Sequence, residues 1–116
     1  MASPQPTYKK KFQVISLTWA LASGDTPVGW AFPRADRSVQ VKGTPSGATV
    51  TLLGSNDEGA TWFALKDAAT GTAISFTAAG GCQILEHSQM VKPSIAGGDG
   101  STALEVIVSA AKKRLR

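Results

Sequence analysis

The chain has 116 residues, of which 12 are Lys or Arg and 8 are Asp or Glu, and its formal net charge is +4. This length predicts one domain with a modest core, and no apolar run approaches the roughly 18 residues that a membrane-spanning helix requires. Seven cations lie near the chain ends, so the middle carries five cations against eight acids, a net −3, which argues against a uniformly basic nucleic-acid-binding surface.

We expect the first segment, residues 1–11, to be an extended arm. Pro4 and Pro6 stand where a signal peptide would need an apolar core, so we expect a soluble protein that is made in the cytoplasm. From Phe12 the sequence FQVISLTW alternates with period two and is rich in β-branched and aromatic residues. This pattern predicts a strand.

Residues 23–38 are expected to form a long loop, because they contain two prolines and two glycines and show no sustained periodicity. Loops of this length in a compact domain usually carry function or become ordered on a partner. Trp30, Phe32 and Arg34 are therefore candidate contact residues.

The rest of the chain alternates short strand-like segments with clusters of turn residues such as TPSG, SNDEG and AGGDG. The last segment could also form a short helix, although its β-branched run VIV favours a strand. Together with the first strand, about eight strands predict an all-β antiparallel sandwich over residues 12–111, most simply a jelly roll, followed by a basic tail at 112–116. The seven predicted segments are 38–43, 48–54, 61–66, 72–78, 82–86, 89–95 and 102–109.

One local motif is the Asp-box pattern S-x-D-x-G-x-T-W, which sialidases carry in several copies. Its chemistry is conformational: the aspartate caps backbone N–H groups, the glycine accepts a positive φ and the tryptophan packs beneath the turn. A single copy without an arginine cluster favours a structural turn, joining the strands at 48–54 and 61–66, over a glycosidase site. The motif residues are Ser55, Asp57, Gly59, Thr61 and Trp62.

The glycine-rich segment 97–100 (GGDG) predicts a hairpin in which Asp99 caps the turn. A phosphate-binding loop would need a following Lys-Ser/Thr pair and a helix, and neither is present. One carboxylate is also too few for a calcium site.

No catalytic or metal-binding pattern emerges. Cys82, the single cysteine, cannot form an internal disulfide, and with His87, the single histidine, it makes no metal-ligand spacing. No G-x-S-x-G nucleophile elbow accompanies the His87–Ser88 pair. We therefore expect no enzyme activity, no cofactor and no metal, and we expect the acids to be solvated in turns: Asp36, Asp57, Glu58, Asp67 and Asp99.

The basic ends have three possible roles. Terminal cations can simply keep a protein of low charge soluble, they can contact an acidic protein surface, or they can contact nucleic-acid backbone. Nucleic acid is the least favoured of the three. The residues concerned are Tyr8, Lys9, Lys10, Lys11, Lys112, Lys113, Arg114 and Arg116.

A family resemblance covers the stretch from Val39 to Val108, about 60% of the chain. It begins VQVKGTPSGATVTLLGSNDEGATWFALKDAATGTAISFTAAG and continues in EHSQMVKPSIAGGDGSTALEVIV. This stretch resembles small virion proteins of tailed bacteriophages, which are single β-sandwich or jelly-roll modules that bind the outside of a capsid as cement or decoration proteins.

The resemblance implies a non-catalytic role in the virion, at the capsid surface, with the major capsid protein as the partner. It carries no active-site residue over to this chain. We expect a dimer or trimer that docks through the arms and the 23–38 loop, with no membrane partner. The alternative is a glycan-binding module of a phage fibre or tail adhesin, which would use Trp30.

Overall fold

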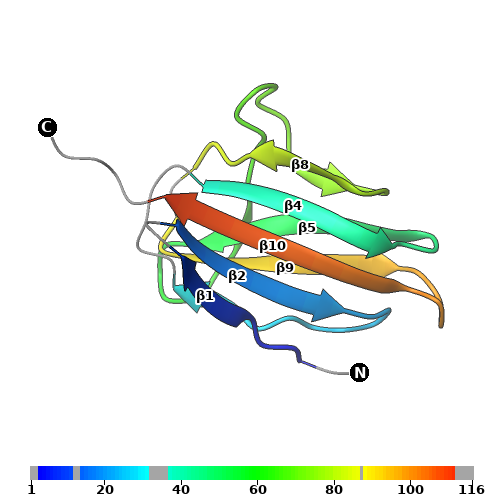
Figure 1. The fold of residues 1–116 in the computed structure, drawn as a ribbon. Helices are drawn as coiled ribbons and strands as arrows, with labels where there is room; N and C mark the ends of the chain where they lie inside the picture. The colour runs from blue at the N-terminus through cyan, green and yellow to red at the C-terminus, as the bar shows by residue number, and fades with distance from the viewer. Residues whose placement is uncertain (1–2, 12–13, 32–36, 87, 112–116) are drawn as a thin grey trace, which may run out of the picture.

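The computed structural model describes residues 3–11, 14–31, 37–86 and 88–111, and the protein in these ranges is all-β. Two antiparallel sheets of five strands each stack face to face, which confirms the predicted sandwich (Figure 1). We call the sheet nearer the viewer in Figure 1 the front sheet and the other one the back sheet.

The strands of the front sheet lie in the order β1 (Thr7–Lys11), β2 (Val14–Leu21), β10 (Ala103–Ala111), β4 (Arg37–Thr44) and β8 (Gly80–Gln83). Those of the back sheet lie in the order β3 (Trp30–Ala31), β9 (Met90–Gly97), β5 (Ala48–Ser55) and β6 (Phe63–Ala64), and β7 (Ser75–Phe76) also pairs with β5.

The pairing of the strands is nested. In the front sheet β2 pairs with β10 and β4 pairs with β8. In the back sheet β3 pairs with β9 and β5 pairs with β6. A chain that folds as one long antiparallel ribbon and then rolls up produces this connectivity, which is the eight-strand jelly roll. β1 is an additional strand at the edge of the front sheet.

The core lies between the sheets, where alternate side chains of each long strand point inward. In β2 the inward positions are Ile15, Leu17, Trp19 and Leu21, all at most 4% exposed. The Trp19 indole Nε1 donates a hydrogen bond of 2.8 Å to the Val28 carbonyl, which satisfies the polar atom of this buried ring. The period-two pattern in the sequence therefore identified the buried face correctly.

Two predictions about connections were wrong. The expected loop 23–38 contains the short strand β3, and β4 begins at Arg37, because these residues pair with β9 and β10. The glycine-rich segment 97–100 is not a hairpin, since β9 belongs to the back sheet and β10 to the front sheet. Gly97 and Gly98 do adopt positive φ, 74° and 91°, but they carry the chain from one sheet to the other.

Part of the expected N-terminal arm lies along the sandwich. All five residues of β1 pair with β2, from Thr7 opposite Thr18 to Lys11 opposite Val14. Before β1, the Val28 N–H donates to the Pro4 carbonyl at 2.9 Å, so this segment also contacts the 22–29 loop. β1 is nevertheless attached mainly through its backbone, because its side chains from Thr7 to Lys10 are all exposed.

Candidate docking end of the sandwich

The strand register brings the last residue of β1 and the last residue of β10 to the same end of the front sheet. Lys11, the last residue of β1, lies opposite Val14, and Val14 lies opposite Ala111 on the far side of β2. Ala111 directly precedes Lys112 in the chain. Neighbouring strands are about 4.8 Å apart, so the backbones of Lys11 and Ala111 are separated by about 10 Å.

We call this region the basic end. It is the end at which β1, β5, β8 and β10 finish and β2, β4 and β9 begin, on the left in Figure 1. Lys9 lies opposite Ser16, on the outer face of the front sheet, and Lys10 lies opposite Ile15, on the side of the core. Both lysines are exposed at the sheet edge, so they present charge on either side of it.

Large apolar side chains are exposed at this same end. Five such side chains are exposed among the described residues, and four of them lie at the basic end: Val14, Trp30, Phe63 and Leu85, between 38% and 50% exposed. The fifth, Tyr8, lies in the middle of β1, opposite Leu17. Clustered exposure of this kind is more informative than scattered apolar residues, which are normal on protein surfaces.

Trp30 and Phe63 occupy the two outer positions of one cross-strand row in the back sheet. Trp30 lies opposite Val91, Val91 opposite Gly54, and Gly54 opposite Phe63. Residues that oppose each other share a face of the sheet. Val91 is fully buried, whereas the two aromatic residues lie on short outer strands and remain partly exposed.

Gly54 lets this row approach the segment that leads into β9. A Cβ atom at Gly54 would lie 2.6 Å from Ser88 Oγ and 2.7 Å from Leu65 Cδ2. The Ser88 hydroxyl is buried and donates to the Met90 carbonyl at 2.8 Å. The base of the basic end is therefore tightly packed.

A buried arginine lies at this end as well. Arg37, the first residue of β4, is 3% exposed, and its guanidinium lies 3.4 Å from Ser88 Oγ across the sandwich. Burial lowers the pKa of Arg37, but a guanidinium remains protonated at neutral pH. This residue lies on β4, which β2 and β10 separate from the lysines of β1.

The Asp-box turn stands beside the basic end, where it joins β5 to β6. The Asp57 carboxylate accepts hydrogen bonds from the Thr61 N–H at 2.9 Å and from the Ser55 hydroxyl at 2.7 Å. These bonds lower the pKa of Asp57 to about 2, with the Thr61 hydroxyl contributing most. Glu58 and Gly59 both adopt positive φ, 62° and 91°. The motif residues thus form a capped turn, as the pattern predicts.

The turn is also tied to the residues before β9. Asn56 Oδ1 accepts from the Gln89 N–H at 2.9 Å, and Gln89 Oε1 accepts from the Glu58 N–H at 2.8 Å. This reciprocal pair of bonds fixes the position of the turn against the sandwich.

Trp62 packs beneath this turn. A Cβ atom at Gly59 would lie 3.4 Å from the indole, and one at Gly29 only 2.4 Å from it, so the ring fills the space between the turn and the loop before β3. The ammonium of Lys92 lies 4.4 Å from the ring centroid, within cation–π range. The Trp62 ring thus contacts the fold along its benzene edge and carries Lys92 over one face, whereas Trp30 is partly exposed.

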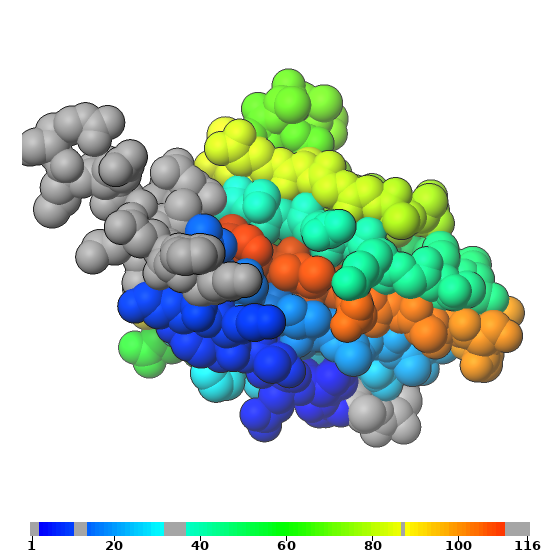
Figure 2. All heavy atoms as spheres, in the orientation of Figure 1, coloured from blue at the N-terminus to red at the C-terminus, as the bar shows by residue number. Residues whose placement is uncertain are grey.

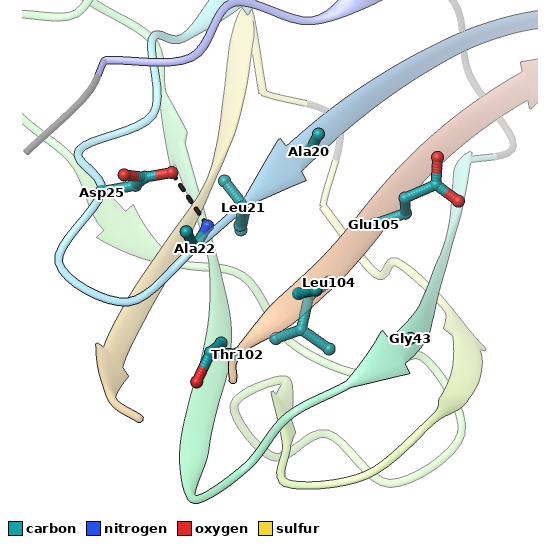
Figure 3. A pocket seen from close by; sticks show the side chains of 9 residues that line it. Ala20, Leu21, Ala22, Asp25, Gly43, Thr102, Leu104 and Glu105 are labelled. Carbon is teal, nitrogen blue, oxygen red and sulfur yellow. Dashed lines mark hydrogen bonds between the residues drawn. The ribbon is translucent and has the colours of Figure 1, made fainter. Parts of the chain in front are cut away.

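The opposite end of the sandwich has a different character. It holds a shallow depression of about 420 Å³, where β2 and β4 end and β10 begins (Figure 3). Asp25 and Glu105 stand at its wall, but Asp25 accepts a hydrogen bond from the Ala22 N–H at 2.9 Å and Glu105 pairs with Lys42 at 3.2 Å. These carboxylates therefore have contacts within the fold.

The glycine-rich connection at this opposite end is capped by Asp99. The carboxylate accepts from the Ser46 hydroxyl at 2.7 Å and the Ser101 N–H at 2.8 Å, and these bonds lower the pKa of Asp99. Asp99 thus stabilises the crossing between the sheets.

The outer face of the front sheet, which Figure 2 shows from outside, carries several serine and threonine side chains together with Gln40 and the Lys42–Glu105 ion pair. Ser16 and Ser109 share a hydrogen bond of 3.0 Å across β2 and β10, and Ser38 continues the row on β4. Ile107 is half-buried near the centre of this face. The face is thus distinct from the apolar and basic end.

The remaining candidates have structural positions. Cys82 is half-buried opposite Val39, and burial, with a smaller contribution from Asp67, raises the pKa of its thiol. A thiol with a raised pKa is a weaker nucleophile at neutral pH. No group of three His, Cys, Asp or Glu residues that could hold a metal occurs within the described ranges. The same ranges contain no helix of the length and apolarity needed to cross a membrane.

The structure places some of the predicted contact residues and not others. Tyr8 and the lysines lie on β1, and Trp30 lies on β3. Several predicted residues fall outside the described ranges: Phe32, Arg34, Asp36, His87, Lys112, Lys113, Arg114 and Arg116.

Sequence reasoning missed three exposed apolar residues at the basic end: Val14, Phe63 and Leu85. Phe63 could have been found, because it directly follows the Asp-box turn and must therefore stand at the end of a strand. The period-two pattern does put Val14 on the outer side of its strand, opposite to Ile15, but gives no sign that this position belongs to a docking end. Leu85 resembles an ordinary core residue in an apolar segment, and only the folded structure shows that it is exposed.

No family model matches this chain, and no curated protein matches it in sequence.

Proposed function

We propose that the protein is a non-catalytic virion component that binds and stabilises the surface of a bacteriophage capsid, as cement or decoration proteins do. The observation that carries the proposal is the basic end, where the exposed lysines Lys9 and Lys10 and four exposed apolar side chains lie at the same end of a single sandwich. The resemblance of residues 39–108 to small phage virion proteins supports the same role.

A rigid sandwich with one distinct end suits attachment to a larger assembly. Interfaces commonly combine apolar anchors, aromatic ones above all, with surrounding charge. Here Trp30 and Phe63 supply the anchors and the lysines of β1 supply the charge. The outer face of the front sheet would remain available for solvent or for a second copy of the chain.

The proposal is tested by co-sedimentation of the purified protein with capsid shells that lack it. We expect the protein to sediment with intact shells in saturable amounts and to raise the temperature at which the shells open. If the protein stays in the supernatant at every concentration, or if it binds without a fixed stoichiometry, the proposal is wrong.

The second candidate function, glycan binding, is favoured by one observation, the partly exposed indole of Trp30. Aromatic rings that face solvent can stack on sugar rings. This alternative predicts retention on a glycan array that drops on substitution of Trp30→Ala. Failure to retain any member of a broad glycan panel would eliminate it.

A further inference from the structure

We infer that the basic end recognises a protein surface of one particular chemistry: carboxylates that border an apolar centre. The inference rests on the proposed function in one respect only, namely that the capsid shell carries this surface. It adds the partner chemistry and the orientation, with the strand ends of the sandwich, rather than its outer faces, directed at the shell.

The first step is the distribution of charge along the sandwich. The exposed lysines Lys9 and Lys10 lie on the half of β1 that runs to the basic end. At the opposite end, the one described lysine, Lys42, is paired with Glu105. Electrostatic complementarity therefore selects an acidic surface for the basic end, and such complementarity mainly governs orientation and association rate.

The second step is the position of the acids at the basic end itself. Asp57 and Glu58 lie in the Asp-box turn, which belongs to the back sheet, whereas the lysines belong to the edge of the front sheet. Glu86, which follows Leu85, is paired with Lys66 at 3.7 Å. The partner's carboxylates must therefore face the front-sheet edge and avoid the turn. This arrangement fixes the rotation of the sandwich on its partner.

The third step is the contribution of the apolar side chains. Trp30, Phe63 and Leu85 are each at least 38% exposed, and each comes from a different segment of the chain. A nucleic-acid backbone would use the lysines but would leave these three groups without apolar partners. A protein surface with an apolar centre uses both kinds of group, which is why we favour it over nucleic acid.

The lysines of β1 also have a purely structural explanation that must be separated from docking. Charged residues on an edge strand prevent the sheet from pairing with other chains, and lysine is the commonest choice. Glutamate would protect the edge equally well but would repel an acidic partner. Charge reversal at Lys9 and Lys10 therefore distinguishes the two roles.

The experiment measures shell binding by co-sedimentation for the full-length chain and four variants. We expect the double variant Lys9→Glu/Lys10→Glu and the variant Phe63→Ser each to bind at least about tenfold more weakly, equivalent to roughly 1.4 kcal/mol. The matched controls are Lys42→Glu, a charge reversal near the opposite end, and Ile107→Ser, an apolar truncation on the front face; both should bind within about twofold of the wild type. Circular dichroism confirms that each variant is folded, and Leu85→Ser replaces Phe63→Ser if the latter is not.

A second arm uses NMR of the ¹⁵N-labelled chain with two defined probes, a synthetic peptide that alternates glutamate with leucine and phenylalanine, and a short DNA duplex. We expect the peptide to shift the resonances of Val14, Trp30 and Phe63, and the duplex to cause no comparable shifts at physiological salt.

The outcomes separate the inference from the proposed function. If the wild type binds shells and the controls lose as much affinity as the basic-end variants, the inference is wrong and the proposed function stands. If the wild type does not bind shells, the proposed function fails, and the inference stands only if the peptide shifts are confined to the basic end. Stronger binding of the DNA duplex than of the peptide overturns the inference in either case.

Discussion

At the scale of single residues, the Asp-box turn shows how a local motif can be chemically specific and still be structural. Asp57 caps the turn through Ser55 and Thr61, while Trp62 closes the turn from below. The side chains of the motif are engaged with one another or with the fold. The motif thus helps to make the region next to the basic end rigid.

This arrangement predicts a pH-dependent effect of the substitution Asp57→Asn. The pKa of Asp57 is about 2 in the folded protein, below its usual value, so ionised Asp57 stabilises the fold above about pH 4. That contribution is lost as the pH falls from about 4 through about 2. We expect the variant to have a lower Tm than the wild type at pH 7, with the difference shrinking at pH 2 to 3.

Thermal unfolding followed by circular dichroism at several pH values checks this prediction. Glu58→Gln is the matched control, because it removes a charge from the neighbouring exposed side chain. A difference between Asp57→Asn and the wild type that is independent of pH would show that the charge of Asp57 does not stabilise the turn.

A second prediction at this scale concerns Gly54, which lies where the back sheet contacts Ser88. A Cβ atom there would come within 2.8 Å of three side-chain atoms of Ser88 and Leu65. We therefore expect Gly54→Ala to destabilise the fold by about 1–3 kcal/mol, the usual range for overpacking. Gly100→Ala is the control, since no atom lies within 4 Å of its added Cβ.

Chemical denaturation of both variants measures the free energy of unfolding. An unchanged free energy for Gly54→Ala would mean that the segment around Ser88 can move away, and the basic end would then be less rigid than the packing indicates.

At the scale of elements, strands were predictable and connections were not. The alternation of apolar and polar residues located the long strands to within a few residues, because a half-buried strand must alternate. The segments TPSG before β5 and GGDG before β10 contain the turn residues that are typical of a hairpin, yet each connects a strand of one sheet to a strand of the other. Turn residues show where the backbone bends. Which sheet the next strand joins depends instead on strands that are distant in the sequence.

The site was predictable only in part for the same reason. The lysines of β1 and Trp30 stand out in the sequence, but their position at the same end of the sandwich depends on the pairing of β1 with β2 and of β3 with β9. Phe63 and Leu85 come from other segments that meet these strands only in the folded sandwich.

The edge strand β1 leads to a prediction about deletion of residues 1–11. Because the side chains from Thr7 to Lys10 are exposed, the deletion removes strand pairing but little core, and the shortened chain should remain folded. It should also lose binding to the capsid shell and, with the edge of β2 uncovered, associate with itself more readily. Circular dichroism, sedimentation velocity and shell co-sedimentation measure the three effects, and an unfolded product or wild-type shell binding would contradict them.

At the scale of the whole molecule, the net charge of +4 does not show that the charges are distributed unevenly between the two ends of the sandwich. The acids of the middle segment mainly cap turns or pair with lysines, as at Asp99 and Glu105. The exposed lysines Lys9 and Lys10 lie on the part of β1 that runs to one end of the sandwich, where exposed apolar side chains also lie. The two ends of this jelly roll therefore differ in character, and we propose that the basic end is the one that attaches to the shell.

The most direct test of this account is a cryo-electron microscopy reconstruction of capsid shells decorated with the protein. We predict that the strand ends containing Val14, Phe63 and Leu85 contact the shell, with β1 facing acidic side chains of the capsid protein. Contact through the opposite end or through the outer face of the front sheet, or the absence of ordered density for the protein, would contradict the account.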